Sequence, residues 1–184
     1  IQNIPYGVEF YMVQFACHLY TLIDYCVYKR KAVQFWEMFL HHSMAVFLIF
    51  FSYMTGGIRV GIMVLYVHDP CDVLVYANRI ISELKNPWKP FQYFSYLCLL
   101  IGWVYFRLFA FPKAIVGAAF DYVLSGDLGI LYSPHLFMTL MLASLVILHI
   151  YWFICILKVL VNMVTGKKHY NDYDVSNKQA KKAE

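Results

Sequence analysis

Five long apolar stretches constrain this chain more than any other feature of its sequence. They cover residues 8–27, 35–53, 58–81, 91–111 and 135–163. A helix needs about 20 mostly apolar residues to cross the hydrocarbon core of a bilayer. Hydrophobic residues make up 61% of the 184 residues and charged residues only 14%, whereas charged residues form about a quarter of an ordinary soluble domain. The sequence therefore predicts an all-α membrane protein with five spans.

Polar and turn-forming residues mark where these spans are interrupted or end. Three titratable residues interrupt the first span: Glu9, His18 and Asp24. The Gly56-Gly57 pair predicts a tight turn between the second and third spans. Pro112 is expected to end or kink the fourth span. A loop is expected over residues 121–134, between the fourth and fifth spans.

Basic residues gather on one side of this predicted topology. With five spans, that side holds the loop after the first span, the loop after the third span and the C-terminal tail. Its basic residues are Lys29, Arg30, Lys31, Arg79, Lys85, Lys89, Lys167, Lys168, Lys178, Lys181 and Lys182. The other side holds Arg59, Arg107 and Lys113. The five spans predict a membrane domain over residues 1–164. Because basic loops stay in the cytosol, we expect the tail over residues 165–184 to be cytosolic.

Five titratable residues lie inside the second and third spans, where a charge is costly. They are His41, His42, His68, Asp69 and Asp72. Counted from the glycine turn at 1.5 Å per residue, both clusters lie roughly 17–22 Å away, so they can meet at a similar depth. A carboxylate beside an imidazole reduces the cost of burying either group in lipid and fixes the imidazole tautomer. The sequence predicts a functional His–Asp cluster, with helix-to-helix hydrogen bonds as the alternative.

Neither a metal site nor a nucleic-acid surface is predicted. The adjacent His41 and His42 point about 100° apart on a helix, so they chelate a single ion poorly. The His-x-x-His-His spacings of membrane desaturases are absent, and the five cysteines have neither metal-ligand nor disulfide-framework spacing. The basic runs do not alternate with exposed aromatic residues, so nucleic acid is not an expected partner.

The stretch from 41 to 79 resembles the Lag1 motif of ceramide synthases, which lies within a TLC (TRAM–Lag1–CLN8) domain. The matching elements are His41-His42, Ser52-Tyr53, Arg59-Val60-Gly61 and His68-Asp69-Pro70-Cys71-Asp72. Arg107 followed by Pro112, and Tyr151-Trp152 in the last span, also resemble the family. Two positions depart from the pattern, since Tyr76 stands where many members have Glu and Arg79 where they have Lys.

The resemblance implies a bundle of transmembrane helices curved around a central lipid tunnel. The chain begins at Ile1 rather than Met, so it is expected to be a fragment of a longer protein. The implied bundle is expected to be completed by a sixth span upstream. The implied activity joins a fatty acyl group from acyl-CoA to the amine of a sphingoid base. The implied catalytic residues are His41, His42, Asp69 and Asp72. The implied substrate-binding residues are Ser52, Tyr53, Arg59, Tyr76 and Arg107.

The resemblance also implies partners and a location. The expected partners are fatty acyl-CoA, a sphingoid base and membrane lipid; acyl-CoA is a substrate, and no cofactor is expected. A homo-oligomer or an accessory membrane subunit is left open. The Lys181-Lys182-Ala183-Glu184 ending resembles a dilysine signal for the endoplasmic reticulum, with the mitochondrial inner membrane as the alternative location. The alternative function is a non-catalytic TLC-domain subunit that binds lipid or has a structural role.

Overall fold

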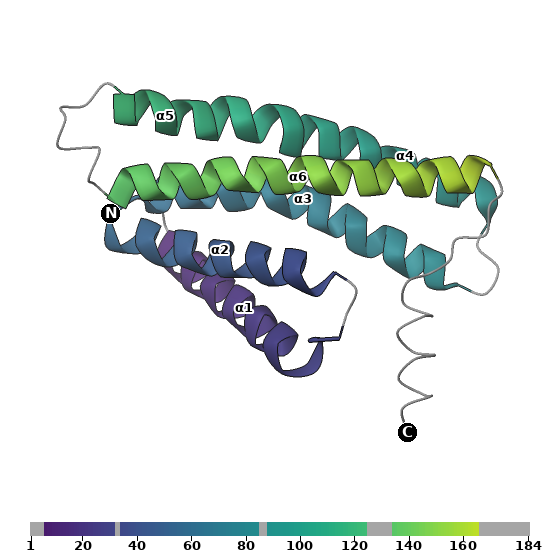
Figure 1. Ribbon diagram of the computed structural model, residues 1–184, viewed down its shortest axis with the longest axis horizontal. Coiled ribbons are helices and arrows are strands. Elements are labelled where there is room, and N and C mark those ends of the chain that lie inside the picture. The colour runs from purple at the N-terminus through teal and green to yellow at the C-terminus, as the bar shows by residue number, and fades with distance from the viewer. Residues whose placement is uncertain (1–5, 32–33, 85–87, 125–133, 166–184) are drawn as a thin grey trace. The chain divides into compact units, whose positions relative to one another are not determined.

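All the elements of the computed structural model are helices over the residues it describes, 6–31, 34–84, 88–124 and 134–165 (Figure 1). They are α1 (Gly7–Tyr28), α2 (Phe35–Met54), α3 (Ile58–Glu83), α4 (Lys89–Gly102), the π-helix η1 (Trp103–Val116), α5 (Gly117–Leu124) and α6 (Pro134–Val164). The predicted all-α fold is confirmed. The predicted tail from residue 166 onward lies outside the described residues.

Four helical segments among the described residues are long and apolar enough to cross a membrane. They are Phe35–Met54, Ile58–Ser82, Lys89–Asp121 and His135–Val164. Many of their large apolar side chains are exposed, including Phe94 at 63% and Ile147 at 71%, which suits contact with lipid tails rather than water. The chain is therefore a multi-pass membrane protein. The first predicted span does form a helix, α1, but α1 is not among these four segments.

Helices α1 and α2 pack against each other in the first of two compact units, Ile1–Ile58 with Val161–Glu184. On α1, Tyr11, His18 and Tyr25 recur every seven residues, which is about two turns, so they share one face of the helix. This face meets α2, because the Tyr11 hydroxyl hydrogen-bonds that of Ser52 at 2.7 Å and the His18 ring lies 5.8 Å from the ring of His42. The sequence spacing thus brings α1 side chains to the predicted histidine pair.

The predicted glycine turn closes the C-terminal end of α2. The backbone N–H of Gly57 donates to the carbonyl of Ser52 at 2.7 Å, and that of Gly56 donates to the carbonyl of Tyr53 at 3.2 Å. This pair of bonds is a Schellman motif, which satisfies the last carbonyls of a helix. Gly56 has a φ of 75°, a left-handed conformation that a residue without a Cβ adopts at little cost. The tight-turn prediction is confirmed.

The second unit, Arg59–Leu160, contains α3, the continuous run α4–η1–α5, and α6. These helices lie alongside one another (Figure 1). The Tyr96 hydroxyl of α4 donates to the carbonyl of Ile156 on α6 at 3.2 Å, and the Asn78 amide of α3 donates to the carbonyl of Ser95 on α4 at 3.2 Å. The α4–η1–α5 run therefore contacts both neighbours, and its side chains can join α3 to α6.

A small residue lets α3 approach the end of α4. A Cβ added to Gly102 would meet Leu74 Cδ1 at 3.1 Å, so glycine leaves just enough room at this position. The thiol of Cys71, which is fully buried, points at the carbonyl of Gly102 at 3.5 Å. The contact fixes α3 directly beside the start of η1.

The expectation that the fourth span ends at Pro112, and that a loop begins at residue 121, was wrong, whereas the alternative of a kink at Pro112 stays a prediction. The helix runs through Pro112 as η1 and continues to Leu124. Hydrogen bonds of a π-helix reach five residues back, so each turn is wider than in an α-helix; this relieves the clash between the proline ring and the preceding turn. Arg107, expected at one membrane surface, lies inside this run. Residues 125–133 lie outside the described part of the chain.

The buried residues of η1 follow the wider turn. Trp103, Arg107, Phe111 and Ile115 are all buried and recur every four residues. In an α-helix at 100° per residue, each four-residue step would overshoot by about 40°. A helix with more residues per turn keeps such a series closer to one face. The π-helix is thus the local feature that points Arg107 and its neighbours into the second unit.

Candidate functional site

The histidine pair of α2 lies against aromatic and imidazole rings of α1. His41 and His42 are half-buried, with ring centroids 5.2 Å apart. The ring of His42 also lies 5.8 Å from that of His18 and 5.6 Å from that of Tyr25. Its Nδ1 atom is buried and makes no hydrogen bond among the described residues. An imidazole with such a nitrogen can take or release a proton.

A cation lies at the end of the same α1 face. The Lys29 ammonium is 4.8 Å from the centre of the Tyr25 ring and 2.6 Å from the Asp24 carboxylate. The ion pair is partly exposed, so it contributes at most about 1 kcal/mol to stability. It closes one side of the cluster formed by His18, Tyr25 and His42.

Ser52, predicted to bind substrate, has its hydroxyl engaged within the protein. This hydroxyl donates to the carbonyl of Gly57 at 3.1 Å and accepts from the phenol of Tyr11 at 2.7 Å. Only 3% of Ser52 is exposed. The side chain thus joins α1, α2 and the glycine turn, which is a structural role. Neighbouring Tyr53 is 40% exposed.

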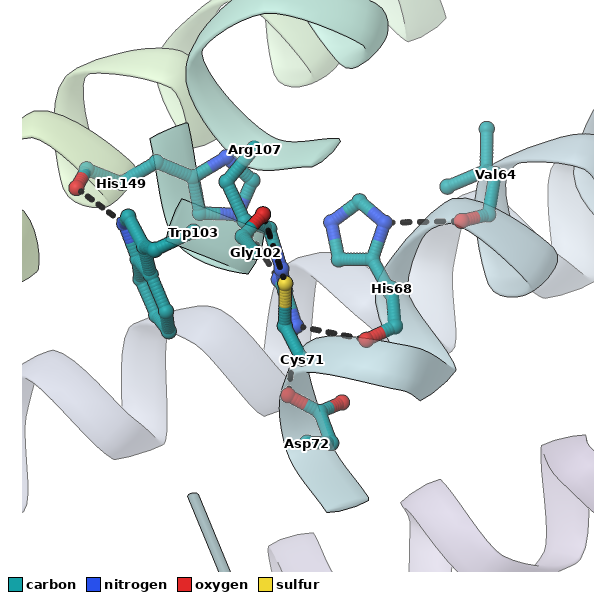
Figure 2. Close-up of polar contacts among 8 residues, drawn as sticks. All are labelled: Val64, His68, Cys71, Asp72, Gly102, Trp103, Arg107 and His149. Atoms are coloured by element: carbon teal, nitrogen blue, oxygen red, sulfur yellow. Dashed lines mark hydrogen bonds and ion pairs between the residues drawn. The ribbon is translucent and has the colours of Figure 1, made fainter. Parts of the chain in front are cut away.

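In the second unit, Arg107 is the centre of a polar cluster that joins three helices (Figure 2). Its Nη2 atom donates to Asp72 Oδ1 at 2.5 Å and to the backbone carbonyl of His68 at 3.2 Å. Its Nη1 atom lies 3.0 Å from Nε2 of His149 on α6. Only 1% of the Arg107 side chain is exposed, against 47% of the Asp72 side chain. A guanidinium buried this fully needs such partners.

The rings around this cluster hold its members in fixed orientations. His68 Nδ1 lies 2.7 Å from the carbonyl of Val64, which can only accept, so this nitrogen carries the proton. The bond is local, since the two residues are four positions apart on α3. The indole of Trp103 donates to the carbonyl of His149 at 3.1 Å, and the Arg107 guanidinium lies 5.2 Å from the Trp103 ring. Arg107 and His149 therefore sit in a closely packed, mostly aromatic environment.

The remaining predicted site residues are on α3. Asp69 is half-buried, Arg59 is exposed, and Tyr76, which replaces the expected Glu, is 64% exposed. The structure brings Asp72 to Arg107, and His41 to His42 within the first unit. The predicted contact between the histidine pair and the aspartates joins the two units and stays a prediction.

Two histidines of these clusters were not among the residues predicted to be functional. His149 is the acceptor for Arg107, and His18 is the second imidazole beside His42. In the sequence, His18 interrupts the first span, and its seven-residue spacing from Tyr11 and Tyr25 marks a shared face. His149 is the only histidine inside the apolar core of residues 136–164, and that isolation was the available signal.

Metal binding finds no geometric support within the described ranges. No group of three or more His, Cys, Asp or Glu side chains there could hold an ion. The cluster around Arg107 consists of Arg107, Asp72, His68 and His149. Its one carboxylate, that of Asp72, is paired with the Arg107 guanidinium. The arrangement instead suits proton transfer and charge compensation.

Comparison with known proteins identifies relatives across most of the chain. The family model described as the TLC domain matches residues 2–158. Ceramide synthase hyl-1 of Caenorhabditis elegans is 27% identical over 85% of the chain, and ceramide synthase LOH2 of Arabidopsis thaliana is 26% identical over 86%. Human ceramide synthase 4 is 29% identical over 90% of the chain.

The chain spans about half the length of these relatives, matching 45%, 54% and 40% of them respectively. The predicted resemblance to ceramide synthases is confirmed by these similarities. The family match covers well over half of the chain, including the whole motif from residue 41 to residue 79. The chain therefore belongs to the TLC-domain family.

Proposed function

We propose that the protein is a ceramide synthase, which transfers a fatty acyl group from acyl-CoA to the amine of a sphingoid base. Support comes from relatives that carry this name and from a motif that retains both histidines and both aspartates. The proposed substrates, acyl-CoA and a sphingoid base, are those of the ceramide synthase reaction. Membrane-spanning helices suit it, because both the acyl chain and the sphingoid base are lipids.

The observation that carries the proposal is the environment of His42. Its imidazole is half-buried in an apolar helix, with a second imidazole, that of His18, at 5.8 Å and a buried Nδ1 that has no hydrogen-bond partner among the described residues. His149 also has a buried Nδ1 without a hydrogen-bond partner among the described residues, but its side chain is fully enclosed, whereas His42 is half-buried. An imidazole with an unused nitrogen in a shielded site is suited to general base or nucleophilic catalysis.

The chemistry needs one group that accepts a proton. The sphingoid amine is protonated near neutral pH and must lose a proton before it can attack the thioester carbonyl. His41 or His42 takes that proton. That first proton passes to solvent. As the new C–N bond forms, the imidazole takes the second proton from the nitrogen, the C–S bond breaks, and the departing CoA sulfur receives this second proton from the imidazolium. The products are the amide, the CoA thiol and one released proton. Attack by the imidazole itself, through an acyl-imidazole, remains the second route with the same residues.

The aspartates compensate the positive charge that forms on the imidazole. Asp72 is bound to Arg107 through Oδ1, and 47% of its side chain is exposed, so the second oxygen is available to another partner. In this proposal Asp72 orients a histidine of the pair and stabilises the imidazolium. Asp69, which neighbours it on α3, adds negative charge to the same region.

We also propose an endoplasmic reticulum membrane location with the C-terminus in the cytosol. The exposed basic residues Lys29, Arg30 and Lys31 follow α1, and positive-inside counting puts them on the same side as the tail. Fatty acyl-CoA, sphingoid base and membrane lipid are the proposed partners, and self-association or an accessory subunit is not required by the chemistry.

The test is an N-acylation assay on the full-length protein in membranes, with a sphingoid base and labelled acyl-CoA. The unmutated protein should form labelled amide. His42→Ala and Asp72→Ala should each reduce the rate at least about 100-fold, whereas His135→Ala, a histidine outside both clusters, should not. Membrane abundance of each variant is measured alongside. If the unmutated protein forms no amide, a non-catalytic lipid-binding function replaces the proposed ceramide synthase function. If amide still forms in both alanine variants, the assignment of the catalytic residues is wrong.

A further inference from the structure

His149 is the most completely enclosed titratable side chain of α6. None of its surface is exposed. Its backbone carbonyl accepts the Trp103 indole hydrogen at 3.1 Å, and its ring lies 5.0 Å from that of His68 and 5.3 Å from that of Phe111. Contacts from α3 and η1 therefore fix both the backbone and the ring of this residue.

The bond between His149 and Arg107 can form in only one direction. A guanidinium has donors and no acceptor, so Nη1 of Arg107 must donate to Nε2 of His149. The imidazole is then neutral and carries its hydrogen on Nδ1. A protonated ring would present an N–H to the guanidinium, and the contact would be lost. The geometry therefore requires a neutral histidine at this position.

The same guanidinium is bound at its other end. Nη2 donates to Asp72 Oδ1 at 2.5 Å, while Nη1 is held by His149 at 3.0 Å (Figure 2). The guanidinium is planar, so its two terminal nitrogens, Nη1 and Nη2, have a fixed geometry relative to each other. Fixing one of them limits where the other can point. The position of the Asp72 carboxylate thus depends on a residue of α6 that it does not contact directly.

We propose that His149 is a positioning residue for the acyl-transfer reaction. Its neutral imidazole orients Arg107, and Arg107 in turn holds the Asp72 carboxylate in a fixed position. The inference rests on the proposed ceramide synthase function. It assigns His149 no contact with substrate, so the binding of acyl-CoA should not depend on it.

The test compares two replacements of His149 in the full-length protein. His149→Gln keeps an acceptor oxygen within reach of Arg107, whereas His149→Phe keeps a ring of similar size and removes the acceptor. The Phe variant should lose up to about 100-fold in kcat, as expected when a catalytic group is displaced by about 1 Å. Its KM for acyl-CoA should stay within about twofold, since uniform binding is unchanged. The Gln variant should recover most of the lost kcat.

The Arg107→Lys background provides the control for the path of the effect. Lys can neutralise Asp72 but cannot bind both partners in a planar geometry. If His149 acts through Arg107, His149→Phe should cost much less in this background than in the unmutated protein, as coupled residues show in a double-mutant cycle. Equal losses in both backgrounds would overturn the proposal.

Stability and activity are separated by measuring thermal unfolding of each variant in detergent. If His149→Phe does not fold, His149→Met, which is apolar and flexible, replaces it in the same comparison. Gln and Phe variants with the same kcat would overturn the positioning role while leaving the acyltransferase function intact. An unmutated protein without N-acylation activity would overturn both the function and this role.

Discussion

Arg107 is a fully buried cation whose counter-ion is only half-buried. The exposed fractions are 1% for the Arg107 side chain and 47% for that of Asp72. Removing one member of a buried ion pair leaves the other uncompensated and costs about 3–5 kcal/mol. Arg107 is the member that is fully enclosed by protein, so it depends most on its partner. The two members of this pair should therefore respond differently to substitution.

Asp72→Asn should destabilise the protein by about 3 kcal/mol, because it leaves the buried guanidinium without a counter-ion. Adding Arg107→Gln to that variant should restore part of the stability, because the uncompensated charge is then removed. The order of stability of the unmutated protein, the single variant and the double variant is measured from the midpoints of thermal unfolding in detergent. Additive losses, with the double variant least stable, would contradict the assignment of the cost to the unpaired cation.

The same cluster explains which site residues could be predicted from the sequence. The motif spacing identified Asp72 and the histidine pair because these residues lie on consecutive spans at similar distances from a recognisable turn. Arg107, the partner of Asp72, is 35 residues away in the chain. His149, the other partner of Arg107, is a further 42 residues along. Helical periodicity cannot connect such distant positions, so Arg107 was taken as a substrate ligand and His149 was missed.

At the scale of the elements, the turn after α2 depends on one glycine more than on its neighbour. Gly56 has a φ of 75°, and Gly57 does not share this left-handed conformation. A Cβ on Gly57 would meet its nearest neighbour, the carbonyl oxygen of Ser52, at 3.5 Å, an ordinary contact distance. The two glycines thus form a matched pair in which only the first is conformationally required.

Gly56→Ala should lower the free energy of unfolding by about 1–2 kcal/mol, the cost of a left-handed conformation for a residue with a Cβ. Gly57→Ala should stay within about 0.5 kcal/mol of the unmutated protein, or stabilise it slightly by restricting the unfolded chain. Thermal unfolding of both variants in detergent checks the difference. Equal effects would mean that the turn has another conformation in the membrane.

The element boundaries show where local chemistry is sufficient to predict the fold. The predicted spans 35–53 and 58–81 end within about two residues of α2 and α3, because glycine turn chemistry separates them. Pro112 misled the prediction, since proline was expected to end an α-helix and instead lies within a π-helix. The buried residues of η1 recur every four residues. This interval indicates a turn wider than that of an α-helix, on whose periodicity the prediction was based.

At the scale of the whole molecule, the distribution of basic residues predicts which surfaces face the cytosol. Single cysteines are introduced at Arg30 and at Ser176, with the exposed Cys17 and the partly exposed Cys26, Cys98 and Cys155 replaced by Ser. Both should react with an impermeant maleimide in intact, cytosol-out membranes. A cysteine at Arg59 should react only after permeabilisation. Labelling of Arg59→Cys in intact membranes would contradict the proposed topology.

The buried Arg107–Asp72 pair also has a consequence for how the nascent chain enters the bilayer. A guanidinium near the middle of a lone span costs about 2.5–3.5 kcal/mol on biological insertion scales. The strongly apolar segment Lys89–Asp121 must outweigh that penalty until the preceding segment, with its carboxylate, is beside it. Biogenesis should therefore be cooperative: the translocon releases the two segments as a neutralised pair, and a chain that lacks Asp72 is retained there longer and degraded sooner.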